Sequence, residues 1–233
     1  MNVAGLQKLT TTDFPGTLAC IVFTQGCNLK CPYCHNSELI PMLRVLEGDS
    51  ITEDVFFDFL TKRKNVLEGV VVTGGEPLVQ KDVVEFISKI KEKGYKVKLD
   101  TNGTNPQLLK EIIDNKLVDY IAMDIKNDFE RYEKTTGVQG INLENIKKSI
   151  ELLKDSKIDY EFRTTIVKEF HNVDAIANIC EMIGKSSNYF LQNFEDSSNV
   201  MNHSLHGFSS TELQEFQRYF ETRYPKFHVR GIE

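Results

Sequence analysis

The sequence contains no apolar run of about twenty residues, the length that a helix needs to cross a membrane, so we expect no membrane span. It also lacks an excess of basic residues. The formal net charge is −6, which argues against general nucleic-acid binding because that activity needs a basic face, although a local basic patch is compatible with this value. The segment from Met1 to Gly16 has one lysine, no arginine and no apolar stretch, so we expect no secretory signal. These absences predict a cytoplasmic protein.

Cysteine is scarce as well, with five residues in the chain. Thiols stay reduced in the cytoplasm, so a tight group of cysteines there indicates metal binding or redox catalysis and not a disulfide framework. Cys27, Cys31 and Cys34 form such a group. Cys20 and Cys180 stand alone, and we expect them to pack in the core, because a free thiol behaves as a small apolar side chain.

No repeat, low-complexity tract or linker interrupts the sequence, and we expect a single domain over residues 1–233. Short β-branched runs alternate with longer amphipathic segments. The predicted strands are Thr17–Thr24, Gly69–Thr73, Tyr95–Leu99, Leu117–Ile125, Tyr160–Val167 and Tyr189–Phe194, with a final extended piece at Phe227–Gly231. The predicted helices are Glu53–Leu67, Lys81–Lys93, Gln107–Asn115, Leu143–Lys154, Val173–Ile183 and Thr211–Tyr219.

This alternation predicts an α/β fold in which parallel strands are joined by right-handed helical crossovers. The strand–helix units are fewer than the eight of a full barrel, which typically uses about 250 residues. We therefore expect an incomplete (β/α)6 barrel of parallel strands with outer helices, in preference to a flat doubly wound sheet. In either architecture the functional site lies at the C-terminal ends of the strands.

The cysteine group lies just after the first predicted strand, in the segment Gln25–Asn36, and several chemistries compete for it. Cys31-Pro32-Tyr33-Cys34 alone is the dithiol sequence of glutaredoxins. Extended to His35, it also fits the CxxCH pattern of covalent haem attachment. The three cysteines with His35 could be counted as four zinc ligands.

Each of these alternatives has a defect. Covalent haem of this type is generally attached outside the cytoplasm. The adjacent side chains of Cys34 and His35 point in divergent directions, so a single tetrahedral zinc would strain the backbone. A dithiol oxidoreductase leaves Cys27 unexplained. Three thiolates on one loop do suit a cubane iron–sulfur cluster, which normally takes four ligands. One iron then lacks a protein ligand, and the amine and carboxylate of a small molecule can chelate it.

The CxxxCxxC spacing of Cys27, Cys31 and Cys34 resembles the signature of the radical S-adenosylmethionine superfamily. The resemblance implies a [4Fe–4S] cluster whose open iron binds the methionine end of S-adenosylmethionine. It also implies that Tyr33 lies against the adenine, and it makes His35 a candidate cofactor contact. Gly26 is expected to let the backbone pass close to the cluster.

Thr73-Gly74-Gly75-Glu76-Pro77 follows the second predicted strand. Two glycines let backbone groups reach a ligand without side-chain obstruction. Glu76 can accept a hydrogen bond from an ammonium group or hold the loop by bonding backbone amides. By resemblance, this segment is the superfamily element that binds the methionine amino group, with Gly74, Gly75 and Glu76 as cofactor-binding residues.

Polar residues end the next two strands. The sequence Asp100-Thr101-Asn102-Gly103 is a turn signal, and Asp100 and Asn102 are also candidate cofactor contacts. Further on, strand alternation puts Asp124 and Lys126 on one face and Met123 and Ile125 on the other, and one interpretation of Asp124 and Lys126 is a simple ion pair. In glycyl-radical-enzyme activases, which look similar here, the lysine lies near the cofactor and takes part in catalysis. The same resemblance implies a monovalent-cation site, with Asp100, Thr101, Met123 and Asp124 as its candidate ligands.

Two later strands add candidates for cofactor binding. Arg163 lies within an apolar strand, where a cation is costly unless it meets an anion. That anion is either the cofactor carboxylate or a core aspartate. Gln192 is the candidate nucleoside contact of the last such strand. His171, His203, His206 and His228 have no evident partner, and we expect surface or loop positions for them.

The stretch Leu9–Gly16, with Asp13-Phe14-Pro15-Gly16 at its end, resembles anaerobic ribonucleoside-triphosphate reductase activating proteins. In such activases a 5′-deoxyadenosyl radical takes the α-hydrogen of a glycine in a partner enzyme. The resemblance implies that Asp13 faces the incoming glycine loop. As a plain sequence, the segment reads as a Pro-Gly turn. One departure concerns residues 193–196, where some activases carry a histidine that contacts the cofactor.

The remaining cysteines are too few and too far apart for a second cluster. A separate donor, such as a flavodoxin or ferredoxin, is therefore expected to supply electrons. Two alternatives stay open. One is a radical enzyme that acts on a small molecule, such as a deazapurine ring-contracting synthase, which should have a closed pocket. The other is a non-catalytic metal or dithiol module.

Overall fold

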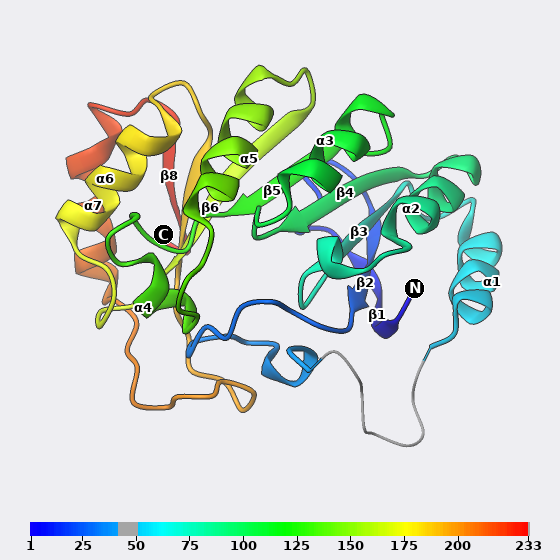
Figure 1. The fold of residues 1–233 in the computed structure, drawn as a ribbon, viewed down its shortest axis with the longest axis horizontal. Coiled ribbons are helices and arrows are strands. Elements are labelled where there is room, and N and C mark those ends of the chain that lie inside the picture. The colour runs from blue at the N-terminus through cyan, green and yellow to red at the C-terminus, as the bar shows by residue number, and fades with distance from the viewer. Residues whose placement is uncertain (42–50, 233) are drawn as a thin grey trace.

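The structure, a computed structural model, describes residues 1–41 and 51–232 (Figure 1). Its eight strands form one sheet in the sequential order β1 to β8. β1 is antiparallel to β2, and every later neighbour pair from β2 to β8 is parallel. The strands are β1 (Val3–Thr10), β2 (Ala19–Thr24), β3 (Gly69–Gly74), β4 (Lys96–Thr101), β5 (Tyr120–Asp124), β6 (Asp159–Ile166), β7 (Tyr189–Asn193) and β8 (Phe227–Arg230).

A long α-helix follows each of the strands β2 to β7, as the alternation predicted, and these helices cover the outer face of the sheet (Figure 1). They are α1 (Glu53–Arg63), α2 (Val83–Glu92), α3 (Pro106–Asp114), α5 (Leu143–Asp155), α6 (Val173–Ile183) and α7 (Ser210–Glu221). The short helix α4 (Tyr132–Thr136) and two 3-10 turns, Ser37–Leu39 and Pro77–Val79, lie in loops at the C-terminal ends of the strands. None of the helices in the described ranges is long and apolar enough to cross a membrane.

Local chemistry sets the helix starts. The Ser209 side chain accepts a hydrogen bond from the Glu212 backbone, and the Glu212 side chain accepts one from the Ser209 backbone, which is a capping box. Asn172 caps α6 in the simpler way, by accepting from the backbone N–H of Ala175 at 2.8 Å. Such caps satisfy N–H groups that a helix leaves unpaired in its first turn.

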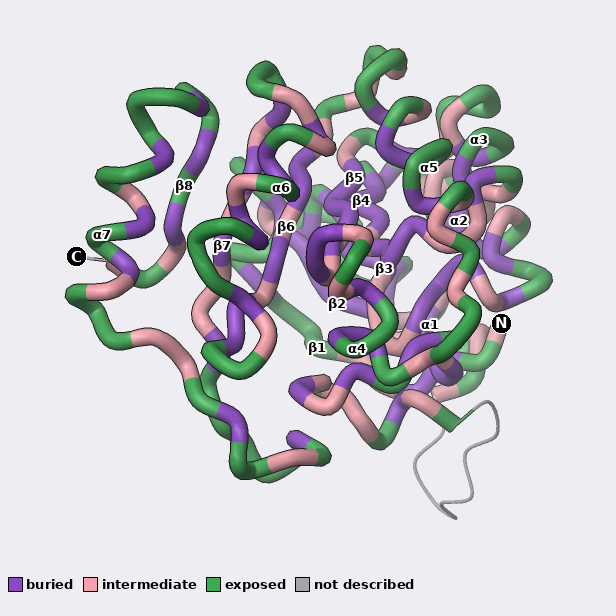
Figure 2. The backbone as a smooth tube through the Cα atoms, turned by 60° about the vertical axis from the view of Figure 1, so that its left-hand side comes forward, coloured by how far each residue is buried: buried purple, intermediate pink, exposed green. Residues whose placement is uncertain are grey.

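The two faces of the sheet differ in chemistry. Alternate residues of each strand point outward and pack with the helices in one core, which includes Val22, Val72, Leu99, Ile121 and Leu191. Figure 2 shows this burial as purple that follows the strands. The other residues point to the concave inner face, where charged side chains accumulate from β4 to β6. They include Lys98, Asp100, Asp124, Glu161 and Arg163.

The architecture is an open, partial barrel. β1 and β8 are the two ends of the strand order and are not paired with each other. The predicted α/β class, the parallel strands and the six strand–helix units are therefore confirmed, and Phe227–Arg230 adds a further parallel strand. The sequence did not predict β1. Its pairing with β2 covers the edge of the sheet opposite β8.

Candidate active site

A pocket of about 210 Å³ lies at the C-terminal ends of the parallel strands. It gathers side chains from the loop after β2 and from the ends of β3, β4, β5 and β6. Its lining contains most of the predicted site residues: Cys27, Cys31, Tyr33, Cys34, His35, Gly74, Gly75, Glu76, Asp100, Thr101, Asn102, Asp124, Lys126 and Arg163. Sequence analysis did not single out the other lining residues: Leu29, Asn36, Ile40, Thr73 and Thr165.

The cysteine loop is held in place through its backbone. The N–H groups of Gly26 and Cys27 donate to the carbonyls of Leu39 at 2.7 Å and Ile40 at 3.1 Å. Lys30 donates to the Thr136 carbonyl, at the end of α4, at 2.9 Å. These bonds tie the loop to two other segments and turn all three cysteines toward one pocket.

Burial raises the pKa of all three thiols, that of Cys27 to about 12 and that of Cys31 to about 11. Reactive redox dithiols have the opposite shift, commonly because a helix N-terminus stabilises the thiolate. Here a three-residue 3-10 turn, Ser37–Leu39, follows Cys34. The loop therefore lacks the α-helical start that would activate a Cys-Pro-Tyr-Cys dithiol.

Tyr33 is buried at the pocket wall, and its ring lies 6.0 Å from the ring of Phe170. Its hydroxyl is buried without a conventional hydrogen-bond partner among the described residues and faces the Cys31 thiol. A buried hydroxyl without a strong partner is costly, so this is a group that a molecule bound in the pocket could satisfy.

Gly74, the last residue of β3, and Gly75 let the end of β3 and its following loop lie close to the end of β2 and the cysteine loop. A Cβ on Gly74 would lie 2.2 Å from the backbone nitrogen of Thr24, and one on Gly75 would lie 2.1 Å from the carbonyl oxygen of Gly26. The glycines therefore let the loop after β3 pack directly against the cysteine loop. This is a different physical reason from the predicted access to a ligand, although both residues also line the pocket.

Glu76 is buried and holds its own loop and the end of β4. Its carboxylate accepts hydrogen bonds from Thr101 Oγ1 at 2.7 Å, Asn102 N at 2.6 Å and Leu78 N at 3.0 Å. Burial raises the pKa of Glu76 to about 7, although these three bonds favour the charged form. Glu76 was predicted either to accept from an ammonium group or to bind backbone amides, and in the structure it binds backbone amides.

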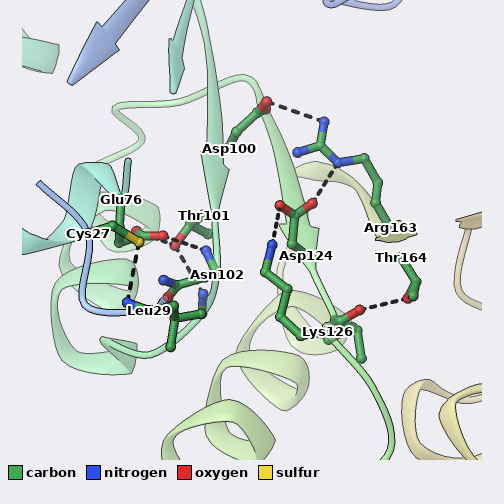
Figure 3. Close-up of polar contacts among 12 residues, drawn as sticks. Cys27, Leu29, Glu76, Asp100, Thr101, Asn102, Asp124, Lys126, Arg163 and Thr164 are labelled. Carbon is green, nitrogen blue, oxygen red and sulfur yellow. Dashed lines mark hydrogen bonds and ion pairs between the residues drawn. The ribbon is translucent and has the colours of Figure 1, made fainter. Parts of the chain in front are cut away.

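A chain of ion pairs crosses the inner face of β4, β5 and β6 (Figure 3). Arg163 donates through Nε to Asp124 at 2.9 Å and through Nη1 to Asp100 at 3.2 Å. Lys126 donates to the other oxygen of Asp124 at 3.0 Å, and Lys98 pairs with Asp100. The anions that meet Arg163 are thus two core aspartates, and Asp124 and Lys126 form the pair that alternation suggested.

The charged groups in this chain of ion pairs shift one another's pKa values. Burial alone would raise the pKa of Asp124, but Arg163 and Lys126 together lower it below its usual range. Burial alone would likewise lower the pKa of Lys126, but the Asp124 carboxylate raises it well above its usual value. Both groups are therefore charged at neutral pH.

The four candidate ligands of the predicted cation site do not all point their side chains to one centre. The Thr101 hydroxyl donates to Glu76, and the Met123 side chain lies on the outer face, in the apolar core. Met123 could therefore contribute only its backbone carbonyl. Asp100 and Asp124 already face arginine and lysine, and in residues 1–41 and 51–232 no three acidic, histidine or cysteine side chains lie close enough together to hold a single metal ion.

Three other predicted contacts lie around the pocket or beyond it. Asn102 donates to the Asn28 side chain at 2.9 Å, which joins the β4 loop to the cysteine loop. His35 is exposed, stacks on Phe194 with ring centroids 5.6 Å apart, and lies 2.7 Å from the Glu195 carbonyl. Gln192 does not line the pocket and lies one strand farther on, paired in register with Thr165.

His171 lies in the loop between β6 and α6, as expected, but it is not at the surface and it has partners. Its ring is buried, with Nδ1 accepting from the Val167 N–H at 3.0 Å and Nε2 at 2.9 Å from the Lys126 carbonyl. Burial lowers its pKa, so the ring is neutral and bridges the ends of β5 and β6. His203, His206 and His228 are exposed, as expected. Asp13 is exposed and accepts from Thr10, while the adjacent Phe14 is buried against the inner face of β2 and β3.

Sequence comparison decides the family of this site. The Radical SAM superfamily matches residues 21–183, which include the three clustered cysteines and every strand from β3 to β6. The chain belongs to this superfamily. Its members use a [4Fe–4S] cluster and S-adenosylmethionine.

Curated relatives point to one branch of the superfamily. A protein of Methanocaldococcus jannaschii with the name "Putative glycyl-radical enzyme activating enzyme MJ1227" is 39% identical over 83% of this chain and 80% of its own length. The pyruvate formate-lyase-activating enzyme of Clostridium pasteurianum is 27% identical over 75% of this chain and 79% of its own length.

Solved structures share the fold. A radical SAM methyltransferase from Sphaerobacter thermophilus superposes with a TM-score of 0.71 at 11% identity, over 95% of this chain and 68% of that one. QueE from Escherichia coli gives 0.59 at 13% identity, over 98% of this chain and 92% of that one. Identities this low establish the architecture alone.

The residues of the pocket suit the cofactors of the superfamily. Three thiols converge where a cluster needs thiolate ligands, and they are one fewer than the usual four. Tyr33 presents a buried hydroxyl without a conventional hydrogen-bond partner among the described residues, and paired charges on the inner face can meet the amine, carboxylate and hydroxyl groups of a nucleoside amino acid. The chemistry of these groups fits both cofactors.

Proposed function

We propose that this radical SAM protein activates a glycyl-radical enzyme, with anaerobic ribonucleotide reductase as its partner. When bound, a reduced cluster and S-adenosylmethionine would supply one-electron cleavage of the sulfonium–C5′ bond, with methionine as the leaving group. A glycine Cα of the partner would then lose one hydrogen atom to the 5′-carbon, so the expected products are 5′-deoxyadenosine and a glycyl radical. The observation that carries the proposal is the convergence of Cys27, Cys31 and Cys34 at the strand ends of an open barrel.

The three cysteines would hold the cluster, because they alone among the described thiols line the pocket; Cys20 and Cys180 are buried in the outer core. The open iron would then take the amine and carboxylate of S-adenosylmethionine. Gly74 and Gly75 place their loop against the cysteine loop, on the side where the methionine would lie. Glu76 keeps that loop closed through backbone bonds.

The other side of the pocket would hold the nucleoside and its charges. We assign Tyr33 and His35 to the adenine side, and Asp100 and Asn102 to the ribose side. Lys126 would donate to the cofactor while Asp124 holds its ammonium group in place at 3.0 Å. Arg163 would act by fixing both aspartates.

Two observations support a protein glycine as the target over a small molecule. MJ1227, named as an activating enzyme, shares 39% identity over most of this chain. The inner face of β7 and β8 is also uncovered, since Phe190, Gln192 and Arg230 are half-buried and His228 is exposed. A small-molecule enzyme is expected to enclose its substrate, whereas a protein loop needs an open side.

The reductase is the finer part of the proposal. It rests on the segment Asp13-Phe14-Pro15-Gly16 and its resemblance to the reductase activating proteins. Phe14 is anchored beneath the inner face while Asp13 stays exposed, so this segment could meet a partner. We further propose that a flavodoxin or ferredoxin supplies the electron in the cytoplasm, where the free cysteines would stay reduced.

The test begins with anaerobic reconstitution with iron and sulfide. The protein should then gain cubane absorption and, with a reductant, convert S-adenosylmethionine to 5′-deoxyadenosine. Addition of the reductase subunit that carries the target glycine should give a glycyl doublet in electron paramagnetic resonance. A doublet with a formate-lyase enzyme and none with the reductase would reassign the partner to the formate-lyase type. The absence of 5′-deoxyadenosine would reject the proposed radical chemistry.

A further inference from the structure

A strip of inner-face side chains joins the pocket to the free edge of the sheet. Thr165 lines the pocket on β6, and it is in register with Gln192 on β7, which is in register with Arg230 on β8. Neighbouring strands lie about 4.8 Å apart, so Gln192 is one strand spacing from the pocket wall. β8 has no strand beyond it, and the strip therefore ends at an open edge.

The middle of this strip is polar and without partners. The side chains of Thr165 and Gln192 are half-buried, and neither forms a hydrogen bond or ion pair with any described residue. Neighbours on the same strands differ. The Thr164 hydroxyl donates to the Ile125 carbonyl at 2.7 Å, and the Asn193 amide is bonded through both of its polar atoms. Thr165 and Gln192 thus keep free donors and acceptors beside the pocket.

The outer part of the strip is rigid. Arg230 donates to both carboxylate oxygens of the buried Glu161 at 2.9 Å, and its guanidinium lies 4.4 Å from the ring centroid of Phe190. His228 stacks on the same ring, with centroids 4.9 Å apart. Side chains that are held in place before binding lose little conformational freedom when a partner docks on them.

The chain itself contains an example of how an amide side chain of β7 can bind peptide backbone, although Asn193 points to the opposite face of the sheet from Gln192. Next to Gln192, the side chain of Asn193 donates to the Phe208 carbonyl at 2.9 Å and accepts from the Phe208 N–H at 2.8 Å. The residue before Phe208 is Gly207, and a Cβ there would lie 2.2 Å from the Phe194 carbonyl oxygen and 3.0 Å from the Asn193 Oδ1. One amide side chain thus binds a peptide segment through its backbone, while the neighbouring Phe194 carbonyl leaves the adjacent glycine no room for a side chain.

A glycine offers no side chain, so an enzyme can select it only by binding its backbone and by leaving no space for a Cβ. From the free amide of Gln192, its register with Thr165 and the Asn193 example, we propose that Gln192 binds the partner's backbone beside the target glycine, on the inner face of β6 to β8. This deepens the proposed function and rests on it. It also reassigns Gln192 from the nucleoside to the protein substrate, in accord with its position outside the pocket lining.

The experiment uses reconstituted full-length protein and a reductase subunit labelled with α-deuterated glycine. Gln192→Leu removes both amide contacts, and Gln192→Glu keeps the shape but removes the N–H donor. Gln214→Leu is the matched control, because Gln214 is exposed on α7, which packs on the outer face of the sheet, whereas the strip lies on the inner face. Three quantities are measured: total 5′-deoxyadenosine, the fraction of it that carries deuterium, and the glycyl doublet.

We expect the deuterated fraction and the doublet to fall about tenfold or more in both Gln192 variants, in line with losing a hydrogen bond that a site was built to make. Gln214→Leu should match the wild type. Unchanged coupling in Gln192→Leu would overturn the inference alone. A parallel loss of total 5′-deoxyadenosine and of S-adenosylmethionine binding would overturn it by returning Gln192 to the cofactor. A wild-type protein that makes 5′-deoxyadenosine without any doublet would reject the proposed partner, and this inference with it.

Discussion

Arg163 and Asp124 meet across β5 and β6, with the Nε of the arginine 2.9 Å from the Oδ1 of the aspartate. The same guanidinium reaches Asp100 on β4, so one cation fastens the ends of two neighbouring strands. Its side chain is 14% exposed and therefore has little water to replace those partners. The inner face of the barrel thus contains a charge chain in which each aspartate meets two cations, Arg163 and one lysine.

Replacement of Arg163 by methionine should destabilise the fold. It keeps much of the side-chain length but leaves Asp100 and Asp124 with one lysine each. We expect a loss of about 3 kcal/mol in the free energy of unfolding, measured by urea denaturation of the cluster-free protein. Arg223→Met is the control, since Arg223 is exposed, and it should change little. Equal losses in the two variants would mean that the ion-pair chain adds nothing to stability.

The five cysteines should separate cleanly into two classes. Cys27→Ala, Cys31→Ala and Cys34→Ala should each lose most of the iron and the cubane absorption after reconstitution, because each removes a ligand of the proposed cluster. Cys20→Ala and Cys180→Ala should keep both, since these thiols pack in the outer core. Iron and sulfide analysis measures the difference. A full cluster in any of the first three variants would contradict the ligand assignment.

Much of this fold could be predicted because buried parallel strands have short continuous apolar sequences, and the six long helices have amphipathic sequences. The strand β1 could not be predicted from the sequence. Its residues Val3–Thr10 show only weak alternation, with exposed positions in the middle, and its pairing depends on β2 as a template. The 3-10 turns and α4 are too short to give a periodic signal.

The site divides in the same way. Its location followed from topology, because parallel strands end at one edge. The ion-pair partners of its charged residues could not be predicted in this way. The contact between Arg163 and Asp100 joins residues far apart in the sequence and depends on the register of three strands. His171 was missed because its burial comes from the packing of a loop after β6. Thr165 had a signal, as it shares a strand face with Arg163.

Glu76 should make stability depend on pH. Its pKa is about 7 in the folded protein and near 4.5 when unfolded, so the folded state binds the extra proton between these values. The stabilisation is full below pH 4.5 and is lost as the pH rises to 7. Relative to Glu76→Gln, which stays neutral, the wild type should lose up to about 3 kcal/mol across this range. Urea denaturation of both cluster-free proteins at several pH values measures it. A pH-independent difference would reject the raised pKa.

Lys126 should matter for the cofactor more than for the fold. Lys126→Met leaves Asp124 paired with Arg163, so the aspartate keeps a counter-charge. The variant should bind S-adenosylmethionine about 30-fold more weakly, which corresponds to roughly 2 kcal/mol for one charge-assisted hydrogen bond. Equilibrium binding to the reconstituted protein measures this effect. Lys148→Met, at an exposed position on α5, is the control. Unchanged affinity in Lys126→Met would remove Lys126 from the cofactor site.

Gly75 tests whether the loops after β2 and β3 must touch. In Gly75→Ala the new Cβ would lie 2.1 Å from the Gly26 carbonyl oxygen, a backbone atom that cannot rotate away. We expect a loss of about 2 kcal/mol in unfolding free energy from overpacking, with poorer retention of iron because the cysteine loop must shift. Gly5→Ala is the matched control, since its Cβ would meet Phe23 at an ordinary 3.6 Å and its backbone, like that of Gly75, is not in the left-handed region. If Gly75→Ala behaved like Gly5→Ala in both measurements, the two loops would be free to separate, and the cluster would not depend on their contact.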